Sequence, residues 1–178
     1  GYLACGYVAK GRMEEPMQIL SVINKFFTQQ KNVVKSSFSG KRALVTAGPT
    51  VEVIDPVRYV SNRSSGKMGY AIAEALRDKG AIVTLISGPT HLSLPEGINV
   101  VKVESAEDMF QAVTERFAKQ DIVIKAAAVS DYTPMDILEH KLKKQEGGLS
   151  VQFKRTKDIL KYLGENKTHQ YLVGFAAE

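Results

Sequence analysis

Residues 41–76 read KRALVTAGPTVEVIDPVRYVSNRSSGKMGYAIAEAL, and this stretch decides the fold. It opens with an apolar run at 43–45, typical of a buried strand, and breaks at Gly48-Pro49. After a long polar segment, apolar residues recur at helical spacing, which predicts an amphipathic helix from Gly66 to about Arg77. The residues of its apolar face are Met68, Ala71, Ile72, Ala75 and Leu76.

Four residues directly before this apolar face suggest an anion site: Ser64, Ser65, Gly66 and Lys67. The first N–H groups of a helix have no intrahelical acceptor, and the helix dipole favours negative charge at that end. Two hydroxyls, a glycine and a lysine at such a position therefore predict a site for a phosphate group. The alternative is an ordinary helix cap beside a solvated lysine.

The rest of the chain alternates between strand and helix patterns. Further strands are predicted at 82–86, 99–103, 121–126, 149–153 and 171–175. Helices are predicted after Ser105, which forms a capping-box pattern with Asp108, and after Thr156. This alternation predicts an α/β fold with a doubly wound, mostly parallel, Rossmann-like sheet.

Three segments are expected along the chain. Residues 1–27 have the pattern of the end of another domain, residues 28–41 have the composition of a linker, and residues 42–178 form the α/β domain. The sequence stops just after the last predicted strand with no closing helix, so we expect this domain to be incomplete at its C-terminus.

Composition limits the classes of function. The 178 residues are 44% hydrophobic and 24% charged, with one cysteine, which predicts a globular protein of a reducing cytoplasm without a membrane span. The net charge is +5, but residues 1–41 hold six basic against two acidic residues. The predicted domain is thus almost neutral, which makes nucleic-acid binding a weak hypothesis.

Standard phosphate and metal motifs are absent. Ser61 and Met68 stand where a Walker A loop needs a glycine and a hydroxyl residue. A dinucleotide fingerprint lacks its third glycine, and Ser87-Gly88 replaces the acidic residue that would hold a ribose, which disfavours an NAD-dependent reductase. Cysteine and histidine show no metal-ligand spacing, so no metal site is predicted.

Polar clusters follow the predicted strands, at the sheet edge where ligands of such folds bind. Arg58 and Asn62 lie in the long loop before the first helix, and together they are more typical of a site for a carboxylate or phosphate than of ordinary surface residues. The lysine-rich segment 139–145 is either a solvated charge run or a mobile lid. Asp131 could be a metal or ribose ligand or a loop cap.

A known family matches these residues. The motif GPTVEVIDPVRYVSNRSSGKMG, followed by AAVSDY, KLKK and GFAAE, resembles the phosphopantothenoylcysteine synthetase domain of bacterial coenzyme A biosynthesis proteins. The leading LACGYVAKGRMEEP resembles the carboxyl end of the phosphopantothenoylcysteine decarboxylase that precedes it in that family.

The resemblance implies a ligase of coenzyme A biosynthesis that uses CTP and Mg²⁺. The carboxylate of 4′-phosphopantothenate would form an acyl-cytidylate, and the amine of cysteine would then displace CMP. FMN would belong only to the absent body of the decarboxylase. A homodimer of the ligase domain and a higher oligomer of the full-length protein are expected, without nucleic acid or membrane. This incomplete chain is expected to turn over little or no substrate.

The resemblance also implies residue roles. Asn62 would hold the reacting acyl end with support from Arg58, Lys141 would assist the nucleotide phosphates, and Cys5 would be the proton donor of the decarboxylase. The implied nucleotide-binding residues are Gly48, Ser64, Ser65, Gly66, Lys67, Lys125, Ala126, Ala127, Ala128, Asp131, Lys141, Lys157, Asp158, Ile159 and Phe175.

Some points depart from the family or stay open. The family pattern has Asn-Pro where this chain has Thr156-Lys157, which weakens the nucleotide contact implied there. From the residues alone, a non-catalytic module that binds a nucleotide or phosphate remains an alternative to the ligase. ATP in place of CTP is a second alternative.

Overall fold

The computed structural model describes residues 15–31, 38–143 and 148–175. The chain divides into two compact units, residues 1–36 and 37–178, which are described separately. In the first unit, helix α1 spans Pro16–Lys31 and begins at the proline, as that residue's fixed φ favours. Cys5 lies outside the described residues, so its predicted role has no structural counterpart here.

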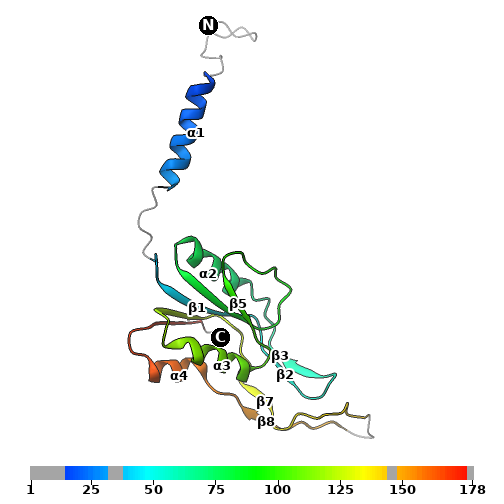
Figure 1. Ribbon diagram of the computed structural model, residues 1–178. Coiled ribbons are helices and arrows are strands. Elements are labelled where there is room, and N and C mark those ends of the chain that lie inside the picture. The colour runs from blue at the N-terminus through cyan, green and yellow to red at the C-terminus, as the bar shows by residue number, and fades with distance from the viewer. Residues whose placement is uncertain (1–14, 32–37, 144–147, 176–178) are drawn as a thin grey trace, which may run out of the picture. The chain divides into compact units, whose positions relative to one another are not determined.

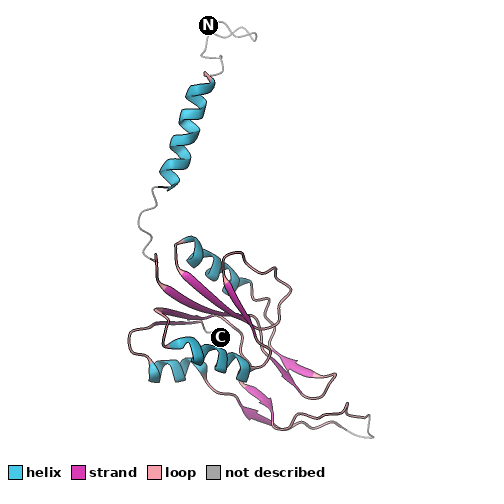
Figure 2. Ribbon diagram, viewed as in Figure 1, coloured by secondary structure: helices cyan, strands magenta, loops and turns pink. Residues whose placement is uncertain are grey.

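The second unit is built on a five-stranded sheet. Its strands are β1 (Arg42–Ala47), β4 (Ile82–Ser87), β5 (Asn99–Lys102), β6 (Ile122–Lys125) and β9 (Tyr171–Gly174). They lie in the order β5-β4-β1-β6-β9, and every neighbouring pair is parallel (Figure 2). The predicted Rossmann-like sheet is confirmed.

Helices cover both faces of this sheet (Figure 1). Helix α2 (Lys67–Asp78) packs on one face, and α3 (Ala106–Phe117) packs with α4 (Ile159–Asn166) on the other. Because β1 is covered on both sides, it reads as a continuous apolar run rather than an alternating one. The fully buried side chains of β1 are Ala43, Leu44, Val45, Thr46 and Ala47.

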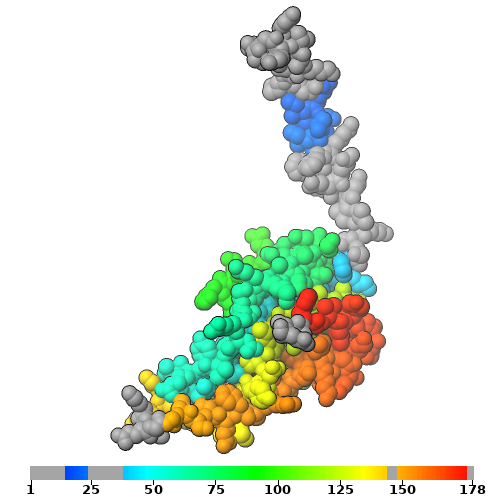
Figure 3. Space-filling model, turned by 180° about the vertical axis from the view of Figure 1, so that it is seen from behind, coloured from blue at the N-terminus to red at the C-terminus, as the bar shows by residue number. Residues whose placement is uncertain are grey.

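Two small antiparallel ribbons were not predicted. β2 (Val51–Val53) pairs with β3 (Tyr59–Ser61), and β7 (Tyr132–Pro134) pairs with β8 (Phe153–Arg155). The strand predicted at 149–153 is therefore wrong, because the pairing strand begins at Phe153 and lies outside the main sheet. Strands of three residues are too short for alternation to identify them. The two ribbons contact each other, and Figure 3 shows these segments (cyan-green and yellow-orange) side by side.

Of the two helix caps that were predicted, one is confirmed and the other is wrong. The capping box of α3 is present, with the Ser105 hydroxyl accepting from the Asp108 N–H and the Asp108 carboxylate accepting from the Ser105 N–H. The latter bond, first among the causes, lowers the pKa of Asp108. The cap predicted at Thr156 is wrong, because Asp158 caps α4 and the Thr156 hydroxyl donates to the Ser130 carbonyl at 2.7 Å.

Within the described ranges, no helix is long and apolar enough to cross a membrane.

The capping box gives a test of local stability. Replacing Ser105 by alanine (Ser105→Ala) leaves an orphan N–H at the start of α3, and we expect the free energy of unfolding to fall by about 1 kcal/mol. Urea denaturation followed by circular dichroism measures it. Ser93→Ala, in an exposed loop, is the control and should leave the midpoint unchanged. Equal midpoints for both variants would contradict the role of this cap.

Candidate functional site

The carboxyl edge of the sheet has a switch point between β1 and β6. The chain leaves β1 to form β4 on one side and returns later to form β6 on the other. Beyond the strand ends the two segments stay joined, because the Ala128 N–H donates to the Gly48 carbonyl at 2.9 Å and the Thr50 N–H donates to the Ala128 carbonyl at 3.3 Å. In open α/β sheets this is the place where ligands bind.

Asn62 lies at this switch point. Its side-chain amide donates to the carbonyls of Ala128 and Val129 at 3.3 and 3.1 Å, although the two segments are more than sixty residues apart. The Asn62 side chain is otherwise exposed, so its carbonyl oxygen is open to a ligand. The structure thus brings together Asn62 and the Ala126–Ala128 run, which were predicted as parts of one site.

The start of α2 lies beside them. Gly66 takes a left-handed conformation (φ 75°) at the N-cap, and no side chain caps the helix. The Ser64 hydroxyl instead accepts from the Gly66 N–H at 3.3 Å, and the Ser65 hydroxyl faces the Lys67 N–H at 3.5 Å. A Cβ at Gly66 would lie 2.7 Å from Thr90 Cγ2 and 3.3 Å from the Gly48 nitrogen, so only glycine permits this close approach.

A cavity of about 420 Å³ lies beyond the end of β6. Five of the residues predicted to bind a nucleotide line this cavity: Lys125, Asp131, Lys157, Asp158 and Ile159. Arg155, which was not predicted, lines it too. Phe175 lies at the neighbouring strand end, where its N–H donates to the Lys125 carbonyl at 3.3 Å, but it does not line the cavity. Asp158 has a structural task as well, because it caps α4.

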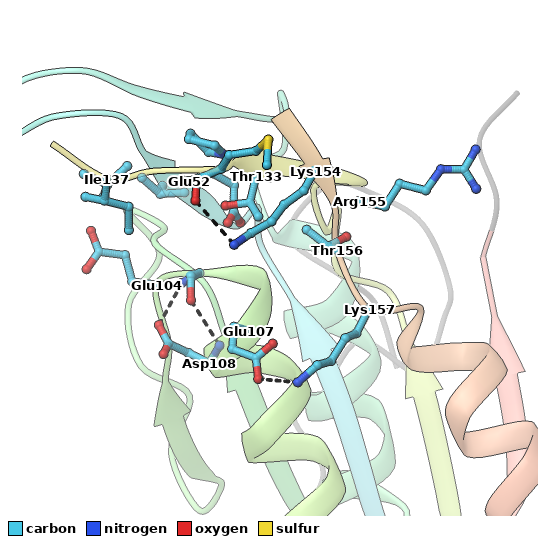
Figure 4. Close-up of a pocket in the computed structure, with 15 residues that line it drawn as sticks. Glu52, Glu104, Glu107, Asp108, Thr133, Ile137, Lys154, Arg155, Thr156 and Lys157 are labelled. Carbon is cyan, nitrogen blue, oxygen red and sulfur yellow. Dashed lines mark hydrogen bonds and ion pairs between the residues drawn. The ribbon is translucent and has the colours of Figure 1, made fainter. Parts of the chain in front are cut away.

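A second cavity, of about 530 Å³, lies between β2, the start of α3 and the β7–β8 ribbon (Figure 4). Lys157 reaches into it and binds Glu107 at 2.7 Å, while its ammonium lies 4.7 Å from the centre of the Phe110 ring. The hydrogen bond from Lys157 is the largest cause that lowers the pKa of Glu107. Lys157 is thus paired with Glu107, which leaves Lys125 and Arg155 as the cations of the first cavity that are open to an anion.

Arg58 and Lys141 are not at the switch point. They line none of the cavities described here. The Arg58 guanidinium lies 3.4 Å from the Asp55 carboxylate and donates to the Leu142 carbonyl at 3.1 Å. The structure therefore joins the loop of Arg58 to the segment of Lys141, but through Asp55, a residue the sequence analysis did not select.

Asp55 and Arg155 are the residues that the sequence analysis missed. An Asp-Pro pair is a turn signal with aspartate in the first position, so the pattern at 55–58 could have identified Asp55 as a turn residue. No local signal marks Arg155, which reaches its cavity through the short ribbon. Among the described residues, no group of three or more His, Cys, Asp or Glu side chains is placed to hold a metal ion.

Comparison with known proteins identifies the family. The model of the DNA/pantothenate metabolism flavoprotein C-terminal domain matches residues 38–178. The chain belongs to this family. The match begins one residue after the boundary between the two compact units and covers the whole sheet.

Named relatives match the entire chain. The coenzyme A biosynthesis bifunctional protein CoaBC of Bacillus subtilis (strain 168) is 54% identical over all of this chain and 43% of its own length. A cysteine/cysteine sulfinic acid decarboxylase from an unknown prokaryotic organism is 44% identical over all of this chain and 50% of its own length. The chain therefore spans about half the length of these relatives, or less.

A solved structure shows the same fold. The crystal structure of the C-terminal domain of the coenzyme A biosynthesis bifunctional protein CoaBC is 52% identical, with a TM-score of 0.71. The match covers 80% of this chain and 67% of that one.

These comparisons correct the activity predicted from the sequence. The matched family is named for a flavoprotein of DNA/pantothenate metabolism, one relative is named for coenzyme A biosynthesis, and another is named a decarboxylase. The predicted CTP-dependent ligation, with CTP and Mg²⁺, is not supported by these names. The confinement of FMN to a domain outside this chain is not supported either, because the family model matched to residues 38–178 carries the name of a flavoprotein.

The close approach at Gly66 can be tested directly. Gly66→Ala forces a Cβ into the left-handed region and against Thr90, so we expect a melting temperature several degrees lower, for a loss on the order of 1–2 kcal/mol. Differential scanning calorimetry measures the shift. The control is Gly164→Ala in α4, where an added Cβ meets nothing within 4 Å. A Gly66→Ala variant as stable as the parent chain would contradict the packing described here.

Proposed function

We propose that this chain binds a phosphorylated, pantothenate-derived compound at the carboxyl edge of its sheet, as one part of a protein of coenzyme A biosynthesis. The observation that carries the proposal is the start of α2, which has no side-chain cap and lies against the turn after β1. In this proposal the phosphate binds N–H groups of the first turn of α2, assisted by Ser64, Ser65 and Lys67.

The neighbouring residues suit the rest of such a ligand. Asn62 offers its amide carbonyl beside the Ala126–Ala128 run, and Lys125 with Arg155 adds positive charge in the cavity beyond β6. An extended ligand with an anionic group at each end would be matched by this arrangement. Lys141 is proposed to reach the ligand from the segment that follows β7.

The reaction of the whole protein is a separate proposal. Decarboxylation of a phosphopantothenoyl compound is the reaction that the comparisons favour, because one relative is named a decarboxylase and the family is named for a flavoprotein. The residues described in this chain supply binding and orientation of the ligand, and we derive no bond-breaking step from them.

The flavin that the family name implies fits only in part. Its phosphate could bind the start of α2 as any phosphate monoester could. A third cavity is lined in part by Pro89, Leu92 and Leu94, and three hydroxyl side chains of its lining are paired with one another. The Tyr70 hydroxyl contacts the Ser87 hydroxyl at 3.1 Å and accepts from the Thr90 hydroxyl at 3.2 Å, so these three groups already bond one another.

The exposed side chains of the two ribbons support a proposed homodimer. Val57 and Tyr59 are about three-fifths exposed, and Tyr132 and Met135 about half, on segments that lie together. We expect Tyr59→Glu to convert a dimer to a monomer, because a charge would be buried in the interface. Light scattering coupled to gel filtration gives the mass, with Tyr171→Glu at the sheet edge as the control. A monomeric parent chain would refute the dimer.

Phosphate recognition is tested by calorimetric titration of the chain with 4′-phosphopantothenate and with pantothenate. We expect the phosphorylated compound to bind at least about tenfold more tightly, because only it can use the start of α2. Lys67→Ala should weaken its binding about three- to tenfold. The charge-matched control Lys119→Ala, at an exposed position after α3, should not change it.

Two outcomes would count against the proposal. Equal affinities for pantothenate and its phosphate ester would show that the start of α2 does not hold a phosphate. A parallel titration of FMN, followed by flavin fluorescence, separates a general phosphate site from a flavin site. Binding of FMN but not of 4′-phosphopantothenate would replace the proposed ligand by the flavin.

A further inference from the structure

The segment 135–143, called here the arm, follows β7 and carries Lys141. All its side chains from Met135 to Lys141 are exposed, and Leu142 is only partly buried. Because the arm buries so little apolar surface, the hydrophobic effect does not fix its position. Its position must come from polar contacts.

Three hydrogen bonds join the arm to the turn before β3. The Leu138 N–H donates to the Ile54 carbonyl at 3.0 Å. The Leu142 N–H donates to Asp55 Oδ2 at 3.1 Å, and the Arg58 guanidinium donates to the Leu142 carbonyl at 3.1 Å. Both backbone groups of Leu142, the residue after Lys141, are therefore held by the Asp55–Arg58 pair.

The two oxygens of Asp55 have different partners. Oδ1 accepts from the N–H groups of Val57 and Arg58, both at 2.8 Å, and so closes the local turn. Oδ2 accepts from Leu142 and faces the Arg58 guanidinium at 3.4 Å. The carboxylate is completely buried. Burial alone would raise the pKa of Asp55, but the backbone donors and Arg58 outweigh it and lower that pKa.

We propose that Asp55 is a positioning residue, whose Oδ2, together with Arg58, fixes the arm and so sets where Lys141 lies. The contact of Lys141 with a ligand rests on the proposed function, whereas the attachment of the arm to Asp55 does not. The two parts can therefore fail separately.

Asp55→Asn separates the two tasks of the carboxylate. The amide oxygen can remain at the Oδ1 position and keep the Val57 and Arg58 N–H groups, which places the NH₂ group at the Oδ2 position. That group then meets the Leu142 N–H and the Arg58 guanidinium, both donors. The substitution should thus release the arm and leave the turn closed.

Hydrogen exchange on the ligand-free chain tests the attachment. We expect the Leu142 amide to exchange at least about tenfold faster in Asp55→Asn, because it loses a hydrogen bond to a charged group. The amides of β1 report whether the fold is intact. Asp121→Asn is the matched control, since that carboxylate also accepts a backbone N–H (Arg42, 2.8 Å) and faces a cation (Lys41, 3.5 Å).

A second variant guards against misfolding of the first. Arg58→Met keeps the Asp55 carboxylate as the acceptor of the Leu142 N–H and removes the guanidinium contacts with the Leu142 carbonyl and Asp55 Oδ2, so a smaller acceleration at Leu142 is expected. Unchanged exchange at Leu142 in both variants, with the fold intact, would overturn the attachment. If the Leu142 amide exchanged equally faster in Asp121→Asn, the attachment of the arm to Asp55 would be overturned as well.

Titration with 4′-phosphopantothenate then tests positioning through a double-mutant cycle of Asp55→Asn and Lys141→Ala. We expect each single variant to weaken binding about three- to tenfold, and the double variant to bind no more weakly than Lys141→Ala alone. Additive losses would show that Asp55 does not act through Lys141. An unchanged affinity in Lys141→Ala would show that Lys141 does not contact the ligand. If the parent chain did not bind 4′-phosphopantothenate at all, the proposed function would be refuted, but the hydrogen-exchange result would still hold.

Discussion

The meeting of several backbone segments around the end of β1 is the constraint on which the rest of this structure depends. A Cβ at Gly88 would lie 1.7 Å from the Pro49 carbonyl oxygen, and one at Gly69 would lie 2.5 Å from the Ala47 Cβ. Without side chains at these points, α2 and the end of β4 can lie directly on the turn after β1. The same closeness places the start of α2 at the switch point of the sheet, where its N–H groups face outward.

The sheet was predictable because its signals are local and strong. The strand signal at 43–47 and the capping box at Ser105 are complete within a few residues of sequence, and both appear as predicted. The two ribbons could not be predicted, because strands of three residues are too short to show an alternation of apolar and polar residues. Their pairing also joins residues up to 23 positions apart. The cap of α4 was misassigned because Thr156 and Asp158 are both good capping residues, and only the fold decides between them.

The candidate site was predictable where backbone groups define it. Glycine, serine and lysine before an amphipathic helix indicate an anion site whatever the anion belongs to, so the sequence could suggest a place for a phosphate but could not identify the reaction. The cavity beyond β6 gathers five of the predicted nucleotide-binding residues, yet its charges suit many anions. The ligase assignment came from a resemblance, and the comparisons with named proteins do not support it.

Asp55 shows why buried charge resists prediction from sequence. An aspartate before a proline is usually a solvated turn residue, and only contacts with a segment more than eighty residues away make it a buried anchor. A polar anchor also differs in kind from an apolar one. When the arm leaves, its amides exchange protein acceptors for water, so the net free energy of opening is small compared with exposing a packed side chain. Fixing the arm through hydrogen bonds around one buried carboxylate therefore holds it reversibly, which suits the proposed contact of Lys141 with a ligand.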